Sequence, residues 1–181
     1  MRKMLPIGII ILLLLFGYFF FTKSTTAPSL NKVENQMQQE KMVAEKVDYK
    51  ASFAIFTHGT FRVFTAAMYH NLSEEVFIQA DNPNIVHVKK NGVTWGDFFE
   101  TLPFKLTREC LTTGTGETFC ARSTNSRQAG ENADLKFYLN GVRADNILDK
   151  TINAGDQVLI SYGNESDAQI QKQLQQIPST D

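Results

Sequence analysis

The sequence contains none of the compact motifs that carry common enzymatic chemistry. It has no G-x-S-x-G nucleophile motif, no phosphate-binding loop, no H-E-x-x-H metal motif and no dinucleotide fingerprint. Lysine and arginine are dispersed, and the formal net charge is −1. The chain therefore lacks the basic patch of a nucleic-acid-binding protein. These absences favour a binding or structural role without a cofactor over catalysis.

Cysteine is scarce, because Cys110 and Cys120 are the only two in 181 residues. Nine residues separate them, unlike the Cys-x-x-Cys spacing of thiol–disulfide oxidoreductases. A hairpin centred on Thr115 would place them directly opposite each other, at a separation that a disulfide can bridge. We therefore predict a structural disulfide, which requires an oxidising compartment. Redox catalysis by the pair and metal binding are the alternatives.

Histidine is equally rare, and His58, His70 and His87 are the only three. His58 and His87 fall on predicted strands, and His70 falls on a predicted turn. Neutral imidazoles from neighbouring strands can bind zinc or copper, so an extracytoplasmic metal site is one hypothesis. No H-x-H or H-x₃-H pair is present, which favours ordinary surface or hydrogen-bonded histidines.

Two N-x-S sequons begin at Asn71 and Asn164. Both asparagines would be exported if the N-terminal segment crosses a membrane. In a host with N-glycosylation they are candidate glycosylation sites, although short sequons are frequent by chance.

One long hydrophobic run is present, at residues 5–22 (LPIGIIILLLLFGYFFFT). As a helix it reaches about 27 Å, close to the bilayer core of about 30 Å. Arg2 and Lys3 precede it, so the positive-inside rule places the N-terminus in the cytoplasm. We predict that residues 1–23 form a cytoplasmic tip and a single-pass plasma-membrane anchor, with the rest outside. A cleaved signal peptide is the alternative, but its apolar region is usually shorter.

Residues 24–50 are polar and rich in glutamine, lysine and glutamate, which is typical of a stalk. Within them Leu30, Val33 and Met37 return at partly helical spacing. The prediction is a solvated spacer helix. The alternative is a short coiled coil that joins two copies into a weak homodimer.

Residues 51–165 form the predicted folded domain, of the α+β class. Alternation predicts a half-buried strand or strand pair at residues 53–64, bent at Gly59, with Phe53, Ile55, Phe61 and Val63 on one face. Short strands are predicted at 75–79 and 84–90, with turn residues between them.

A short amphipathic helix is predicted at residues 94–102. Thr94 and Asp97 have the spacing of a capping box, and Pro103 ends the helix. Its apolar face is aromatic and predicted to pack on the sheet; it consists of Trp95, Phe98, Phe99 and Leu102.

The rest of the domain is predicted to be strands and a terminal helix. Strands are expected at 106–111 and 117–122, joined by a hairpin loop, and at 135–139 and 157–162. Residues 166–181 are predicted to form a C-terminal helix and tail.

Two segments resemble parts of the β-grasp domain of ubiquitin-like and sulfur-carrier proteins. They are the predicted helix at 94–102 and the ending at 153–160, NAGDQVLI. The resemblance implies a β-grasp-like mixed sheet with one short packed helix. The chain lacks the terminal Gly-Gly of sulfur carriers, since a predicted helix follows Gly163. The resemblance therefore implies the fold and not the carrier chemistry.

Residues 58–177 resemble an uncharacterised family of single-pass, membrane-anchored exported proteins from uncultured prokaryotes. The resemblance rests on residues 92–99, 135–141 and 159–163. It implies an exported, membrane-anchored domain. The anchor, the stalk, one disulfide-linked domain and the absence of a catalytic set favour a binding or structural module whose partner is an extracytoplasmic protein or a small ligand. Some members carry the label protein disulfide isomerase, which implies thiol–disulfide exchange at Cys110 and Cys120 as an alternative.

Overall fold

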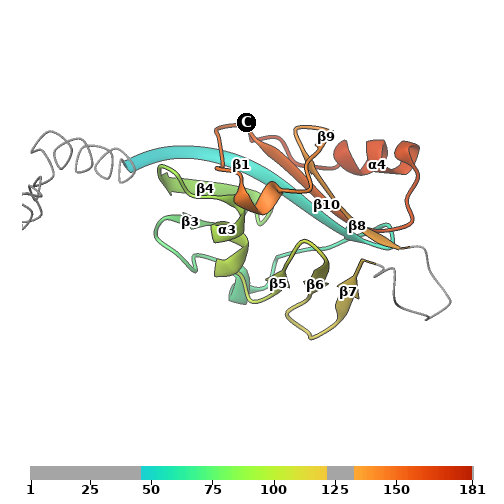
Figure 1. Cartoon of the computed structure of the whole chain (residues 1–181). Helices are drawn as coiled ribbons and strands as arrows, with labels where there is room; N and C mark the ends of the chain where they lie inside the picture. Colours follow the sequence, from blue (N-terminus) through green and yellow to red (C-terminus); the bar gives the residue numbers. More distant parts are fainter. Residues whose placement is uncertain (1–45, 122–132, 181) are drawn as a thin grey trace, which may run out of the picture. The chain divides into compact units, whose positions relative to one another are not determined.

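The computed structural model of the chain describes residues 46–121 and 133–180, and these form an α+β domain (Figure 1). Its elements are β1 (Lys46–Thr57), β2 (Thr60–Phe61), η1 (Ala67–Tyr69), β3 (Val76–Phe77), β4 (Ile85–Lys90), α3 (Trp95–Thr101), β5 (Lys105–Leu106), β6 (Cys110–Thr112), β7 (Thr118–Cys120), β8 (Asp134–Leu139), β9 (Val142–Arg143), η2 (Ile147–Asp149), β10 (Gln157–Gly163) and α4 (Asp167–Leu174). The predicted anchor and most of the predicted stalk lie outside the described residues. Neither described helix has the length and apolar character that a bilayer crossing requires.

The main sheet has seven strands, in the order β3-β4-β1-β10-β8-β9, and β2 pairs with β1 beside this path. β1 and β10 lie parallel at its centre, with Phe53 opposite Val158. β4 is antiparallel to β1, and β8 is antiparallel to β10. β5, β6 and β7 form a separate three-stranded sheet. This mixed sheet with two helices confirms the predicted α+β class.

Both faces of the central strand β1 are buried from Ala51 to its end at Thr57. Phe53 and Ile55 belong to the larger core, which includes the aromatic residues of α3, and Ala54 and Phe56 pack with α4 on the opposite face. Figure 1 shows the two helices on opposite sides of the sheet. The prediction of a half-buried strand is therefore wrong. The alternating pattern predicted that one face of the strand is exposed to solvent, but the helix α4 covers that face. β1 also begins at Lys46, inside the predicted stalk.

The turn between β1 and β2 is formed by His58 and Gly59, which have φ angles of 50° and 73°. Two residues at positive φ match the twist of a tight hairpin, so the predicted strand pair is confirmed. The turn changes the expected faces, however. Phe61 packs on Phe56, with ring centroids 5.1 Å apart, and Val63 is 64% exposed. The prediction that Phe61 shares a face with Phe53 is wrong, and Val63 is not buried with Phe53 as the pattern predicted.

The helix α3 begins at the predicted capping box. The Thr94 hydroxyl accepts a hydrogen bond from the Asp97 N–H at 3.1 Å, and the Asp97 carboxylate accepts one from the Thr94 N–H at 2.8 Å. Its buried aromatic residues pack on β1, and the Phe98 ring lies 5.4 Å from that of Phe53. The helix has only seven residues, so capping and packing are what hold it in place.

A Thr94→Ala variant is expected to lose about 1 kcal/mol of stability, because one N–H of the first turn loses its acceptor. Urea unfolding of the full chain measures this loss. Thr94→Ser is the matched control, since it keeps the hydroxyl. Equal stability of the alanine and serine variants would contradict a capping role.

Candidate functional site

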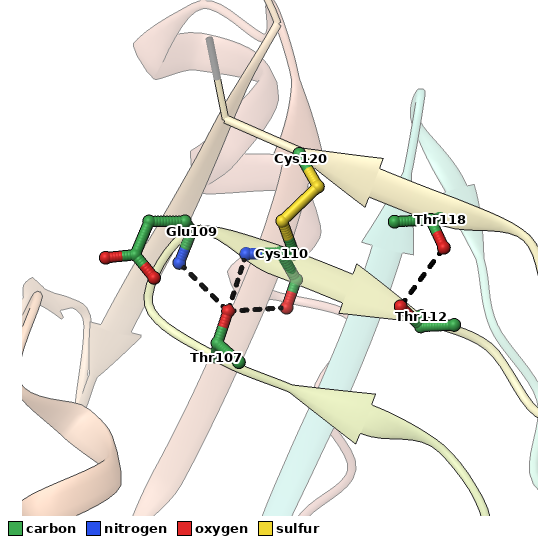
Figure 2. The surroundings of a disulfide bond; sticks show 6 residues. All are labelled: Thr107, Glu109, Cys110, Thr112, Thr118 and Cys120. Carbon is green, nitrogen blue, oxygen red and sulfur yellow. Dashed lines mark hydrogen bonds between the residues drawn. A yellow bond between two sulfur atoms is a disulfide. The ribbon is translucent and has the colours of Figure 1, made fainter. Parts of the chain in front are cut away.

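The two cysteines lie on adjacent strands of the three-stranded sheet. Cys110 on β6 pairs directly with Cys120 on β7, and their Cα atoms are 4.1 Å apart. A disulfide joins them (Figure 2). This confirms the disulfide and the hairpin register that the spacing of the cysteines predicted.

The β6–β7 hairpin has two different faces. The disulfide shares the outer face with the hydrogen-bonded hydroxyls of Thr112 and Thr118, which are 3.1 Å apart (Figure 2). Leu111 follows Cys110 on β6, so its side chain points to the opposite, inner face, and it is only 2% exposed. The disulfide therefore links the two strands on the outer face of the hairpin, and the inner face packs on the core.

A partly open pocket of about 140 Å³ lies between this hairpin and the β1–β2 segment. Ile55, Phe64 and Leu111 are its buried walls. Two residues that follow β2, two aromatic residues and three residues of the β6–β7 loop complete the lining. They are Arg62, Val63, Tyr69, Phe104, Thr113, Gly114 and Thr115. Apolar walls with few polar groups are typical of a binding site.

Gly114 brings the hairpin tip close to the opposite side of the pocket. A Cβ atom at this position would lie 2.8 Å from the Pro103 carbonyl oxygen and 3.2 Å from the Tyr69 hydroxyl. The first distance is too short for any side chain. The pocket therefore keeps its shape only with glycine at the tip.

Arg62 is the one charged side chain in the described pocket lining. Its Nε donates a hydrogen bond to the Thr57 hydroxyl, and its guanidinium carbon lies 5.3 Å from the centre of the Phe119 ring. Glu117 approaches it at 3.6 Å. Arg62 is thus oriented at the rim by a hydroxyl, an aromatic face and a weak ion pair.

The three histidines are not brought together. His58 lies in the β1–β2 turn, against the rings of Tyr162 and Phe119, so the prediction that it lies on a strand is wrong. His70 follows η1, and its Nε2 is 2.8 Å from the Phe64 carbonyl oxygen. His87 lies on β4, as predicted. Within the described residues no three histidine, cysteine, aspartate or glutamate side chains form a group that could hold a metal ion.

His87 packs against an aromatic ring and belongs to no cluster of ligating side chains within the described residues. Its ring stacks on Phe77, with centroids 5.2 Å apart. Burial lowers the pKa of His87, and the nearby charges of Lys50 and Lys89 lower it further. This histidine is therefore an uncharged packing residue at neutral pH.

Both sequon asparagines are exposed. Asn71 has a φ angle of 54°. Asn164 follows β10 directly. Their positions are compatible with the sequence-based suggestion of glycosylation, which stays a prediction.

Sequence reasoning missed the pocket. Its walls come from segments near Ile55, Tyr69, Phe104 and Leu111, which no single periodicity connects. The nearest signal was the Thr-Gly-rich loop of the predicted hairpin, which indicated a turn but not what the turn approaches. No protein-family model, curated protein or solved structure matches this chain, so no relative points to these residues either.

Proposed function

We propose that this protein is a membrane-anchored extracytoplasmic binding module, held in the plasma membrane by residues 5–22, and that the pocket beside the β6–β7 hairpin is its binding site. The uncharged run of 18 residues supports the anchor. The disulfide between Cys110 and Cys120 supports a location outside the cytoplasm, because such bonds persist in oxidising compartments. The pocket is the observation that carries the binding role.

The size of the pocket favours a protein partner over a free small molecule. Its volume of about 140 Å³ is below the range of about 300–1,000 Å³ that is usual for small-molecule sites. A cavity of about 150 Å³ holds one benzene ring, so this pocket suits a single apolar side chain. Val63 lines the pocket and is 64% exposed, and Met68, which is 50% exposed, lies near Gly114. These exposed apolar side chains extend the contact surface around such an anchor.

The proposal includes a β-grasp-like arrangement for the domain and kinship with the exported, anchored family. The sequence resemblance of residues 92–99, 135–141 and 159–163 supports the kinship. The sheet order supports the β-grasp-like arrangement, because parallel β1 and β10 lie side by side between antiparallel β4 and β8. The helix α3 follows the β1–β4 pair in the chain, as the helix does in β-grasp domains.

Photo-crosslinking in cells that carry the full chain tests the proposal. A crosslinking amino acid in place of Val63 is expected to capture one defined partner, because this position lies at the pocket. Val142 on β9 is the matched control, since it is 70% exposed and does not line the pocket. The Val63 product is expected to disappear when Gly114→Val displaces the hairpin tip. Equal capture from Val142, or capture that survives Gly114→Val, would count against the pocket as the site.

Thiol–disulfide exchange is the second candidate function, and the exposure of Cys120 on β7 favours it, since an exposed disulfide is open to attack. Both cysteines lie on strands, however, whereas reactive cysteines usually have a lowered pKa at a helix N-terminus. A reduction potential below about −300 mV is typical of structural disulfides and would remove this candidate.

A further inference from the structure

We infer that the partner presents an acidic residue next to the apolar side chain that enters the pocket, and that Arg62 binds this carboxylate. The inference rests on the proposed function and adds the chemistry of the partner at the same site. It follows from two observations. Arg62 is the one charged residue among the described residues that line the pocket, and its neighbours orient the guanidinium without occupying all of its donors.

The position of Arg62 suits recognition at the rim. Its contacts with Thr57 and Phe119 fix the direction of the side chain before any partner arrives. A guanidinium has five N–H donors, and Thr57 takes only the one on Nε. An oriented guanidinium loses little freedom when it binds a carboxylate, and it can do so through two parallel hydrogen bonds.

Glu117 is the acidic side chain that is paired with Arg62 within the described residues, and the pair is weak. The charged atoms are 3.6 Å apart, and the Glu117 side chain is 59% exposed. Exposed pairs of this kind contribute little to stability. A partner carboxylate that is held in place by a buried neighbouring side chain can therefore displace Glu117.

The hydroxyl groups at the hairpin tip are already engaged with the hairpin itself. The Thr113 and Thr115 hydroxyls are 2.9 Å apart, and the Thr113 hydroxyl also accepts the Glu117 N–H at 3.1 Å. These hydroxyl groups stabilise the conformation of the hairpin tip. Arg62 is therefore the group in the pocket lining that can distinguish partners by their charge.

The experiment measures the affinity of blocked peptides for the full chain in phospholipid nanodiscs, from the methyl NMR shifts of Ile55 and Leu111. The probes are N-acetyl-Leu-Glu-amide, its Leu-Gln analogue and its Ala-Glu analogue. The Leu-Glu probe is expected to bind about fivefold more tightly than the Leu-Gln probe. It is expected to bind about tenfold more tightly than the Ala-Glu probe, because leucine buries more apolar surface.

Three variants assign the charge preference to a residue. Arg62→Gln is expected to bring the ratio of the Leu-Glu to the Leu-Gln affinity to about one, and Glu117→Gln is expected to raise it, because the competing carboxylate is gone. Arg108→Gln is the matched control and is expected to leave the ratio unchanged, since Arg108 pairs with Asp149 and does not line the pocket.

The outcomes separate the inference from the proposed function. Opposite effects of Arg62→Gln and Glu117→Gln support the inference. Leucine-dependent shifts with equal affinity for the glutamate and glutamine probes would overturn the acidic preference and leave the pocket standing as a binding site. No leucine-dependent shift at Ile55 or Leu111 would overturn both.

Discussion

A Lys136→Met variant is expected to unfold with a free energy about 3 to 5 kcal/mol lower than that of the wild type. Lys136 on β8 donates to the Gly163 carbonyl oxygen at 2.9 Å and to the Glu165 carboxylate at 3.1 Å. The side chains of this ion pair are only 9% and 5% exposed. Methionine can fill the space of the lysine stem, but it leaves the Glu165 carboxylate buried without its cation.

The carboxylate of Glu165 lies against the ends of β8 and β10, where it contacts Lys136 and Ser161. The Ser161 hydroxyl donates to it at 3.4 Å. Gly163 has a φ angle of 151°, a conformation that other residues rarely adopt, and a Cβ atom there would also meet the Glu165 carboxylate where it folds back on β10. The ion pair thereby fixes the segment that leads from β10 into α4, and its loss is expected to loosen that helix as well.

Urea unfolding of the full chain measures the effect. Lys172→Met is the control, because Lys172 is exposed on α4, and it is expected to change stability by less than about 0.5 kcal/mol. The double variant Lys136→Met/Glu165→Gln is expected to recover part of the loss, since a neutral amide costs less to bury than an unpaired charge. A loss below about 1 kcal/mol for Lys136→Met would contradict the role of the pair.

The same ion pair predicts how stability depends on pH. Burial tends to raise the pKa of Glu165, but hydrogen bonds from its own N–H, from Lys136 and from the Gly59 N–H lower it below its ordinary value of 4.5. A carboxyl whose pKa is lower in the folded state stabilises the fold above the pKa of the unfolded state, and this contribution is lost as the pH falls through the folded-state pKa. The stability difference between wild type and Glu165→Gln is therefore expected to be constant near neutral pH and to shrink below about pH 4.5.

The elements that the sequence predicted correctly all carry their signal within a few residues. The capping box at Thr94 and the aromatic spacing that follows it placed α3. The equal distances of Cys110 and Cys120 from the hairpin centre gave the disulfide and its register. Ser166 with Gln169 forms a second capping box, at the predicted start of the terminal helix. These features depend on residues close together in the chain, so a local pattern is enough to predict them.

The features that were missed depend on segments far apart in the chain. Lys136 on β8 is only 7% exposed, because α4 and the segment before it cover that face, and the predicted strand at 135–139 does not by itself indicate this cover. The strand β9 has only two residues, which is too short for any periodicity to show. The pocket requires Gly114 to approach Pro103, and nothing near either residue in the sequence indicates that contact.

Replacing both cysteines, as Cys110→Ser/Cys120→Ser, is expected to lower the free energy of unfolding by about 2.8 kcal/mol in the chain-entropy description of disulfides. The bond closes a loop between residues ten positions apart, and its loss frees the unfolded chain. It also removes the outer fastening of the hairpin whose inner residue Leu111 forms a wall of the pocket. The variant is therefore expected to show a shifted and broadened Leu111 methyl signal as well as lower stability in urea.

The control for this variant keeps the disulfide and removes the neighbouring hydrogen bond on the same face. Thr112→Val/Thr118→Val replaces both hydroxyls by methyl groups, which is expected to be nearly neutral because neither partner is left unsatisfied. A large loss for the serine variant with a small loss for the valine variant assigns the stability of the hairpin to the covalent bond. If the serine variant loses less than about 1 kcal/mol and Leu111 is unchanged, the hairpin holds without its disulfide. The bond would then be free to break and re-form, and thiol–disulfide exchange would become the better account of why the cysteines are there.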